Sequence, residues 1–266
     1  MERRGLLVLF DGLDEAATPG RRLHVMELVS AFAENLSASS RILITSRPHD
    51  YARQRFDPKD YRHFDLEEFN DEEIQTFISL WQRQHEPDEH KAGEKAAKLW
   101  KALEDHPRIH ELARNALLLA MIVRVHFGLG TLPENRADLY WKCSETLLKA
   151  WAEAKDLPPS PIDTRQKVRF LAELAYDLQN AAGEEELSEG VTLQIGRRDL
   201  ERRLEGFLRD NLGPGGARYV TEVIERLHAR DAILVQFGGD RFGFVHRSFQ
   251  EYFAGWWLAE ELRDEL

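Results

Sequence analysis

The pattern of apolar and polar positions divides this chain into a strand-and-helix segment followed by a long helical segment. Five consecutive apolar residues, 6–10, run directly into the acidic turn 11–15. A short apolar run that ends at such a turn predicts a strand buried on both faces. Helically spaced apolar residues follow between 23 and 36, and a second apolar run begins at Arg41 and stops at Pro48. Two strands separated by a helix predict a parallel βαβ unit.

Residues 63–66 form a candidate for a short third strand, and from Asn70 onward the apolar spacing becomes helical. Asn70 and Glu73 have the spacing of a helix cap with its reciprocal acid. Proline and glycine then separate a series of predicted helices, which cover about 70–86 and 91–103, then two short segments after Pro107 of which the second contains 115–125, and then 132–151, 164–182, 199–208 and 217–230. Pro158 to Pro161 predicts a stiff linker within this series.

The end of the chain predicts a β-hairpin over 232–237 and 242–246, joined by the turn 238–240. A closing helix is expected over 247–262. Helices followed by a terminal hairpin resemble a winged-helix module. The predicted fold class is therefore α/β followed by mostly α: a partial parallel sheet over 1–69, a helical domain over 70–130 and a winged-helix domain over 131–266.

Composition narrows the classes of partner. The chain has 266 residues and a net charge of −11, which disfavours non-specific nucleic-acid binding because that binding depends on Lys and Arg replacing phosphate counterions. Cys143 is the sole cysteine, so no internal disulfide can form. The apolar run 116–123 is far shorter than a membrane span. These features predict a soluble, cytoplasmic protein without a membrane partner.

The first candidate for chemistry is the acidic turn after the first strand. Open α/β sheets bind ligands at the carboxyl ends of their strands, and Mg²⁺ is commonly held by one or two carboxylates together with phosphate oxygens. Asp11 is therefore a candidate metal ligand, and Asp14 and Glu15 are candidates for polarising an attacking water. The alternative is an acidic strand-to-loop turn that only caps a helix.

Arg47 and His246 are two further candidates. Arg47 follows the second strand, where a guanidinium could contact a terminal phosphate through paired donors; the alternative is a surface arginine at a strand end. His246 stands between the second hairpin strand and the closing helix, where an imidazole could donate to a phosphate oxygen. Taken from the residues alone, a structural histidine that bonds a nearby carbonyl is the favoured interpretation of His246.

Other conspicuous residues predict structure rather than chemistry. Arginines 197, 198, 202 and 203 alternate with acids, which favours a solvated helix face over a nucleic-acid stripe. Cys143 lies among helically spaced apolar residues and is expected to be a buried thiol. The histidine pairs His85/His90 and His106/His110 lack further ligands at metal-binding spacing.

Taken together, these motifs resemble a NACHT-type NTPase of the STAND class of P-loop signalling proteins. Residues 6–16, Leu-Leu-Val-Leu-Phe-Asp-Gly-Leu-Asp-Glu-Ala, look like the extended Walker B motif of that family. Residues 42–48, Ile-Leu-Ile-Thr-Ser-Arg-Pro, look like its sensor strand, and residues 244–254 resemble the end of its winged-helix domain. Residues 131–140 are similar to a stretch of bacterial NACHT proteins.

The resemblance implies a switch that is closed with ADP and opens on nucleotide exchange, after which protomers form a homo-oligomer, and it points toward bacterial antiphage immunity. It places Mg²⁺ at Asp11, hydrolysis at Asp14 and Glu15, and sensing of the terminal phosphate of ATP at Arg47. His246 would bind the diphosphate of ADP and hold the closed form. The family contacts adenine beside an Asn-Pro-Leu motif, which corresponds to Ala116 here.

Two departures from the family pattern affect these expectations. The chain carries no Gly-x-x-x-x-Gly-Lys-Ser/Thr phosphate cradle, and Ala116 replaces the usual proline. We therefore expect the amino-terminal half of a nucleotide-binding domain to be a partner of this chain. The intact parent is expected to be an ATPase, whereas this chain alone is expected to be inactive. A non-catalytic interaction module and a winged-helix DNA binder are the two alternative functions.

Overall fold

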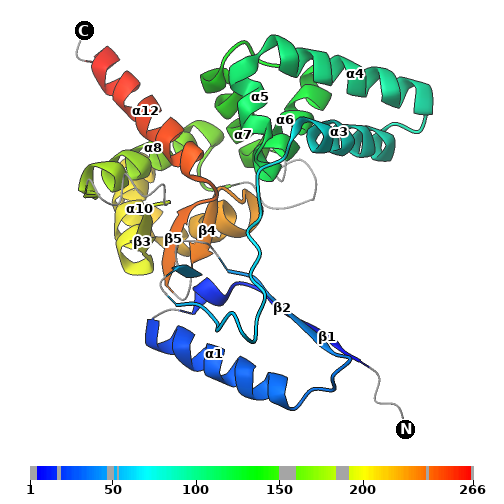
Figure 1. The fold of residues 1–266 in the computed structure, drawn as a ribbon. Coiled ribbons are helices and arrows are strands. Elements are labelled where there is room, and N and C mark those ends of the chain that lie inside the picture. Colours follow the sequence, from blue (N-terminus) through cyan, green and yellow to red (C-terminus); the bar gives the residue numbers. More distant parts are fainter. Residues whose placement is uncertain are drawn as a thin grey trace. The chain divides into compact units, whose positions relative to one another are not determined.

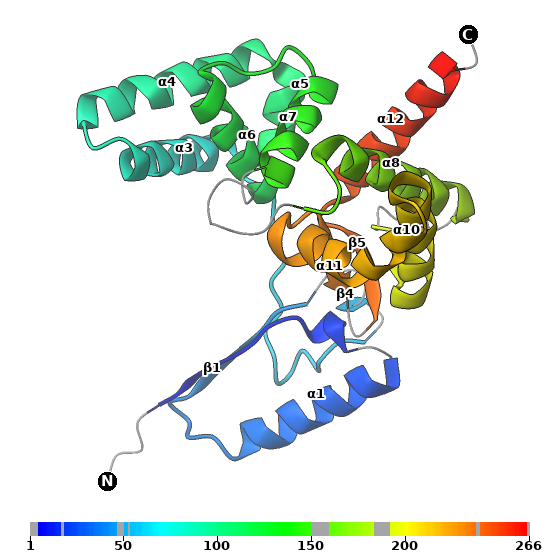
Figure 2. The same ribbon diagram turned by 180° about the vertical axis from the view of Figure 1, so that it is seen from behind.

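The computed structural model describes residues 5–16, 19–46, 51–52, 54–149, 160–183, 192–237 and 240–264 (Figures 1 and 2). The chain is mostly helical, with a small parallel sheet near its amino terminus and a winged-helix region near its carboxyl terminus. It divides into two compact units. The first comprises residues 1–65, 177–221 and 234–247, and the second comprises residues 66–176, 222–233 and 248–266.

The predicted strand–helix–strand segment is confirmed. Strands β1 (Leu7–Phe10) and β2 (Arg41–Ile44) pair in parallel, with Leu7 opposite Arg41 and Phe10 opposite Ile44. The short 3₁₀ turn η1 (Leu13–Glu15) and helix α1 (Pro19–Glu34) connect them. Figure 1 shows α1 running alongside the two strands.

The expectation that β1 is buried on both faces is wrong. Phe10 and Ile44 pack against a small core that includes Met26 and Val29 of α1. The opposite face stays open: Leu7, Leu9 and Leu43 are 69%, 63% and 55% exposed. The side chains of a strand alternate between faces, so a single helix can cover only every second residue. The sequence pattern reported an apolar strand correctly, but one face has no covering element among the described residues.

We call this exposed face, formed by Leu7, Leu9 and Leu43, the open sheet face. Replacing Leu9 and Leu43 together with Thr should reduce binding of a hydrophobic dye and weaken self-association of the chain, because contiguous exposed apolar surface drives both. Each leucine contributes about 1–2 kcal/mol when it is buried at a contact. Dye fluorescence and sedimentation velocity measure the two effects. Leu66→Thr is the matched control, since Leu66 is fully exposed but lies outside the sheet; an equal effect in both variants would contradict this expectation.

The expected third strand over 63–66 is also wrong, because these residues adopt no regular structure. Phe64 and Leu66 are both almost completely exposed. They are separated and followed by acids, and no strand in the described part of the chain supplies backbone partners for them. An apolar pair of this length therefore extends as coil.

The second unit contains most of the helices. Their bounds are α3 (Asp71–His85), α4 (Glu89–Asp105), α5 (Pro107–Ala113), α6 (Ala116–Leu129) and α7 (Arg136–Lys149). The predicted capping box at the start of α3 is confirmed: Asn70 Oδ1 accepts from the Glu73 amide at 3.0 Å, and Glu73 Oε2 accepts from the Asn70 amide at 2.9 Å. Apolar residues of α3, α4 and α6, among them Ile74, Leu99 and Ile122, are completely buried.

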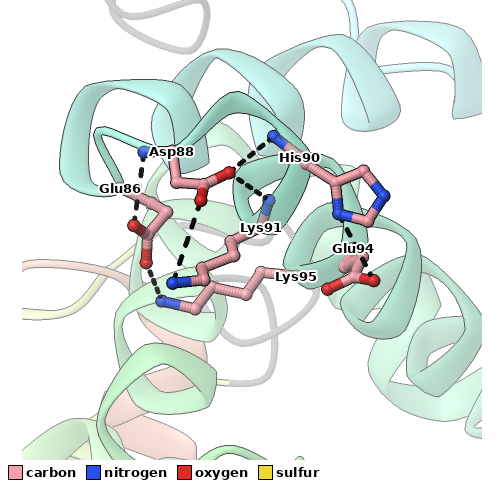
Figure 3. A network of polar contacts seen from close by, with 6 residues as sticks. All are labelled: Glu86, Asp88, His90, Lys91, Glu94 and Lys95. Carbon is pink, nitrogen blue, oxygen red and sulfur yellow. Dashed lines mark hydrogen bonds and ion pairs between the residues drawn. The ribbon is translucent and has the colours of Figure 1, made fainter.

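The turn between α3 and α4 is fixed by a polar network (Figure 3). Asp88 caps α4 by accepting from the amides of His90 and Lys91 at 3.0 and 3.1 Å. Glu86 accepts from Lys95 Nζ at 2.6 Å, and this hydrogen bond holds the pKa of the Glu86 carboxyl below its ordinary value. His90 pairs with Glu94 at 3.5 Å. These contacts orient one helix against the next and explain the local charges without a metal.

The remaining elements have winged-helix topology. Helix α8 (Thr164–Ala181) is followed by strand β3 (Gln194–Gly196), helix α10 (Arg197–Leu212), the 3₁₀ segment η2 (Pro214–Tyr219) and helix α11 (Val220–Glu225). A π-helical turn (Arg226–Arg230) precedes strands β4 (Leu234–Phe237) and β5 (Arg241–Phe244), and helix α12 (Arg247–Asp264) closes the chain. The sheet order is β3-β5-β4, and both pairings are antiparallel.

The predicted hairpin is confirmed as β4 and β5, with Leu234 opposite Phe244 and Phe237 opposite Arg241. Strand β3, which pairs with the other edge of β5, was not predicted. Residues 158–159 of the expected linker and the glycines of the hairpin turn at 238–239 lie outside the described residues. Within the described part of the chain, no helix combines the length and apolarity that crossing a bilayer requires.

Candidate functional site

The acidic turn follows β1 and is connected to the end of β2 through Thr45. The Thr45 hydroxyl donates to Asp11 Oδ1 at 2.5 Å and accepts from the Gly12 amide at 2.9 Å. The Thr45 amide donates to the Phe10 carbonyl, and the Thr45 carbonyl accepts from the Leu13 amide, each at 2.9 Å. Asp11 is exposed. The residue directly after β2 thus holds a solvent-facing carboxylate at the carboxyl edge of the parallel sheet.

Gly12 makes the change of direction possible. Its backbone adopts φ 73° and ψ 50°, which is the left-handed region where a side chain is disfavoured. Leu13, buried in the small core, anchors the first residue of η1. Asp14 is half-buried in this turn. The backbone of Glu15 completes η1, whereas its side chain lies outside the described part of the structure.

Of the other predicted site residues, the structure describes His246 but not Arg47. Arg47 lies outside the described residues, although β2, the strand that leads to it, is present. His246 is half-buried, two residues after β5 and immediately before α12. Convergence of Asp11, Arg47 and His246 on one phosphate therefore stays a prediction.

Ala116 is the exposed first residue of α6 in the second unit. The preceding Asn115 caps this helix by accepting from the amides of Leu117 and Leu118 at 3.0 and 3.1 Å. Capping explains an asparagine at this position without a ligand. A contact between Ala116 and adenine remains a prediction.

A magnesium ion fits the donors of the acidic turn only in part. Among the residues that the structure describes, no group of three or more His, Cys, Asp or Glu side chains is arranged to hold a metal ion. Asp11 offers an exposed carboxylate, and Mg²⁺ usually completes its octahedron with water and phosphate oxygens. The donor set thus suits a metal that arrives with a nucleotide better than a resident structural metal.

The residues expected to be structural behave as such. Cys143 is buried, and burial raises the pKa of its thiol to about 12, which removes it as a nucleophile. Arg197 lies 3.8 Å from Glu201, and the pairs Arg202–Asp199 and Arg203–Asp177 form on the same helix or next to it. The arginines of α10 are therefore part of an ion-paired, solvated face, as the interleaved acids predicted.

Two features were missed by the sequence analysis. Thr45 was treated only as part of the strand that precedes Arg47; a hydroxyl at the first position after an apolar strand was its available signal. The buried ion pair of Lys167 and Asp231, 2.7 Å apart, joins residues 64 positions apart. No local pattern marks such a pair, because Lys and Asp are ordinarily solvated.

Comparison with known families addresses the carboxyl-terminal region. Residues 136–258 match the family model described as the winged helix-turn-helix domain C-terminal to NACHT. The match begins at the first residue of α7 and ends within α12, so it covers the whole three-stranded sheet. This region is thus a winged-helix domain of the kind that follows NACHT domains, and the chain contains a NACHT-associated region. No curated protein matches the chain significantly.

Proposed function

We propose that this chain is part of a nucleotide-dependent signalling switch of the NACHT/STAND class. The single observation that carries the proposal is the position of Asp11, which Thr45, directly after the neighbouring parallel strand, holds at the carboxyl edge of the sheet. Ligands of open α/β sheets bind at this edge. The NACHT-associated winged helix supports the same class of protein and places His246 at the end of the hairpin.

In this proposal, Asp11 binds Mg²⁺ that accompanies ATP or ADP, and the metal neutralises phosphate charge when it is bound. Asp14 and Glu15 orient and deprotonate the attacking water, and Arg47 contacts the terminal phosphate of ATP. His246 donates to the diphosphate of ADP and keeps the switch closed, while Ala116 lies beside adenine. Exchange of ADP opens the protein to homo-oligomers, in a role consistent with bacterial antiphage immunity.

The proposal includes an amino-terminal nucleotide-binding half as a partner of this chain. Backbone amides of a phosphate cradle supply most of the grip on phosphates, and the chain carries no such motif. Without that half, ADP·Mg²⁺ should bind with a dissociation constant of about 1 mM, or roughly 4 kcal/mol, and ATP hydrolysis should not be measurable.

Titration of the ¹⁵N-labelled chain with ADP·Mg²⁺ tests the convergence of the site directly. The amides of Gly12, Leu13 and Thr45 report on the acidic turn, because all three take part in the Thr45 hydrogen bonds. We expect these amides and His246 to shift with one common dissociation constant. Asp11→Asn should remove the Mg²⁺ dependence of the shifts, and His246→Ala should weaken binding about tenfold, the equivalent of one hydrogen bond to a charged group.

Two matched variants control for charge and for histidine content. Asp65→Asn removes an exposed carboxylate of the same unit, and His24→Ala removes an exposed histidine of α1 that pairs with Glu27. Neither should change the titration. Shifts restricted to the acidic turn, or to His246 alone, would contradict a shared phosphate site. A micromolar affinity of the wild-type chain would contradict the need for a separate phosphate cradle.

A non-catalytic interaction module is the second candidate, and the open sheet face is the observation that favours it. Parallel strands are normally covered on both faces, so Leu7, Leu9 and Leu43 suit contact with another protein segment. This candidate predicts association through the open sheet face and no nucleotide-dependent shift at Gly12 or His246. The titration described above therefore separates the two functions.

The charge of the winged helix argues against duplex DNA as a partner. Its third helix, α11, carries the exposed Glu225 and the half-exposed Glu222, and Glu222 pairs with Arg226 at 2.7 Å. A helix that enters the major groove needs cationic side chains for the phosphates on either side. The acids on α11 would repel those phosphates.

A further inference from the structure

Thr45 directs all of its hydrogen-bonding groups at four consecutive residues, Phe10 to Leu13. We propose that Thr45 is a positioning residue that fixes the carboxylate of Asp11 for a divalent cation, an inference that rests on the proposed function. Its backbone groups bind Phe10 and Leu13, and its hydroxyl binds Asp11 and Gly12. The backbone contacts shape the turn, and the side-chain contacts orient the metal ligand.

The direction of these hydrogen bonds is determined by the donors available. The Gly12 amide can only donate, so it occupies an acceptor site of the Thr45 oxygen. The ionised Asp11 carboxylate can only accept, so the single hydroxyl hydrogen of Thr45 points to Oδ1. Oδ2 is outside this bond and belongs to an exposed residue. The arrangement thus orients one oxygen of the carboxylate and leaves the other outside the Thr45 hydrogen bond.

The effect expected from Thr45 is that of a partner to a metal ligand. Groups that hydrogen-bond a ligating carboxylate reduce its rotational freedom, and their removal typically lowers metal affinity by about 10- to 100-fold. Thr45 also belongs to the segment that leads into Ser46 and Arg47. A change at the end of β2 would therefore be transmitted to Asp11 through a single side chain.

Thr45→Val separates the side-chain role from the backbone role. Valine keeps the shape of threonine and both backbone hydrogen bonds, whereas it removes the hydroxyl contacts to Asp11 and Gly12. Thr45→Ser retains the hydroxyl and removes only a methyl group. A purely structural role would make the two variants similar in metal affinity; a positioning role makes valine weak and serine close to the wild type.

The experiment measures the binding of Mn²⁺·ADP to the full chain by electron paramagnetic resonance, because the donors of the acidic turn suit a metal that arrives with a nucleotide. Asp11→Asn should abolish the protein-bound Mn²⁺ site, and Asp65→Asn should leave it unchanged despite the same loss of charge. Thr45→Val should weaken that site about tenfold, while Thr45→Ser stays within about twofold. Amide spectra of Leu13 and Phe10 check that the backbone of the turn is retained in each variant, and Thr45→Ala replaces Val if Val fails to fold.

The outcomes separate the two claims. If Asp11→Asn leaves Mn²⁺ affinity unchanged, the metal site of the proposed function is overturned, and the role of Thr45 with it. If Asp11→Asn abolishes the site but Thr45→Val binds as the wild type does, only the positioning role is overturned. Equal loss in the Val and Ser variants would also overturn it, because the hydroxyl would then be irrelevant.

Discussion

Replacing Lys167 with Met is expected to lower the free energy of unfolding by about 3–5 kcal/mol, the usual cost of leaving one buried charge without its partner. Lys167 Nζ lies 2.7 Å from Asp231 Oδ2, and the two side chains are only 6% and 3% exposed. The pair joins α8 to the residue that follows the π-helical turn, three positions before β4. Asp231 follows a π-helical turn and precedes Ala232, whose positive φ of 51° is unusual for a residue with a side chain.

A double-mutant cycle separates the coupling energy of the Lys167–Asp231 pair from the effects of the two single substitutions. Asp231→Leu alone should cost about as much as Lys167→Met, because it leaves the lysine unpaired in the interior. The double variant should be close to the wild type, since an apolar pair of similar volume replaces a buried ion pair with little loss. Guanidinium denaturation followed by tryptophan fluorescence measures all four proteins. Additive losses would contradict the coupling.

Lys142→Met is the matched control. Lys142 pairs with Glu145 at 2.8 Å, but these side chains are 40% and 23% exposed. A solvent-screened pair is worth at most about 1 kcal/mol. A loss as large as that of Lys167→Met would mean that burial of the Lys167–Asp231 pair is not the cause of the effect.

Lys167→Met should also change how the free energy of unfolding depends on pH. Burial raises the pKa of Asp231 in the folded protein, and the hydrogen bond and charge of Lys167 and the charges of Arg226 and Arg230 oppose this rise. Without Lys167 the pKa of Asp231 in the folded protein rises further, so the neutral form is favoured over a wider range of pH. Stability of the variant is then greatest below the unfolded pKa of about 3.9 and falls as pH rises through the folded pKa. The deficit relative to wild type should therefore grow from pH 4 to pH 7.

An element of this fold is predictable from the sequence when the residues that determine it lie close together along the chain. The apolar run 6–10, the Asn70–Glu73 cap and the 234–244 hairpin were predictable because each depends on residues within a few positions. β3 was missed because Gln194 to Gly196 has no alternating pattern and is a strand only through pairing with β5. Likewise, the 63–66 segment contains apolar residues but pairs with no strand among the residues that the structure describes.

The sequence predicts which acids belong to the candidate site, but not how the residues of the site are arranged in space. Asp11, Asp14 and Glu15 were identified because acids directly after an apolar run are unusual enough to notice. The role of Thr45 required coordinates, since it depends on parallel register that brings residue 45 beside residues 10–13. The exposure of Leu7 and Leu9 was also inaccessible to pattern analysis, because periodicity reports what a strand can bury and not what covers it.

The sequence identifies residues 213–216 as a glycine-rich turn, but it does not show which glycine the fold requires. A Cβ at Gly216 would lie 2.3 Å from the carbonyl oxygen of Leu208 and 2.7 Å from its carbon. A Cβ at Gly215 would have no atom within 4 Å. Gly216 is therefore the residue at which η2 closely approaches the backbone of α10.

Gly216→Ala is accordingly expected to lower the free energy of unfolding by about 2–3 kcal/mol or more, since backbone has to move to relieve the overlap. This corresponds to a decrease of roughly 5–10 °C in the unfolding midpoint of the winged-helix domain, measured by circular dichroism. Gly215→Ala should change the midpoint by less than about 2 °C, because it introduces no contact and reduces the freedom of the unfolded chain. Equal midpoints for the two variants would show that α10 and η2 separate without cost, and that the close approach at Gly216 does not stabilise the domain.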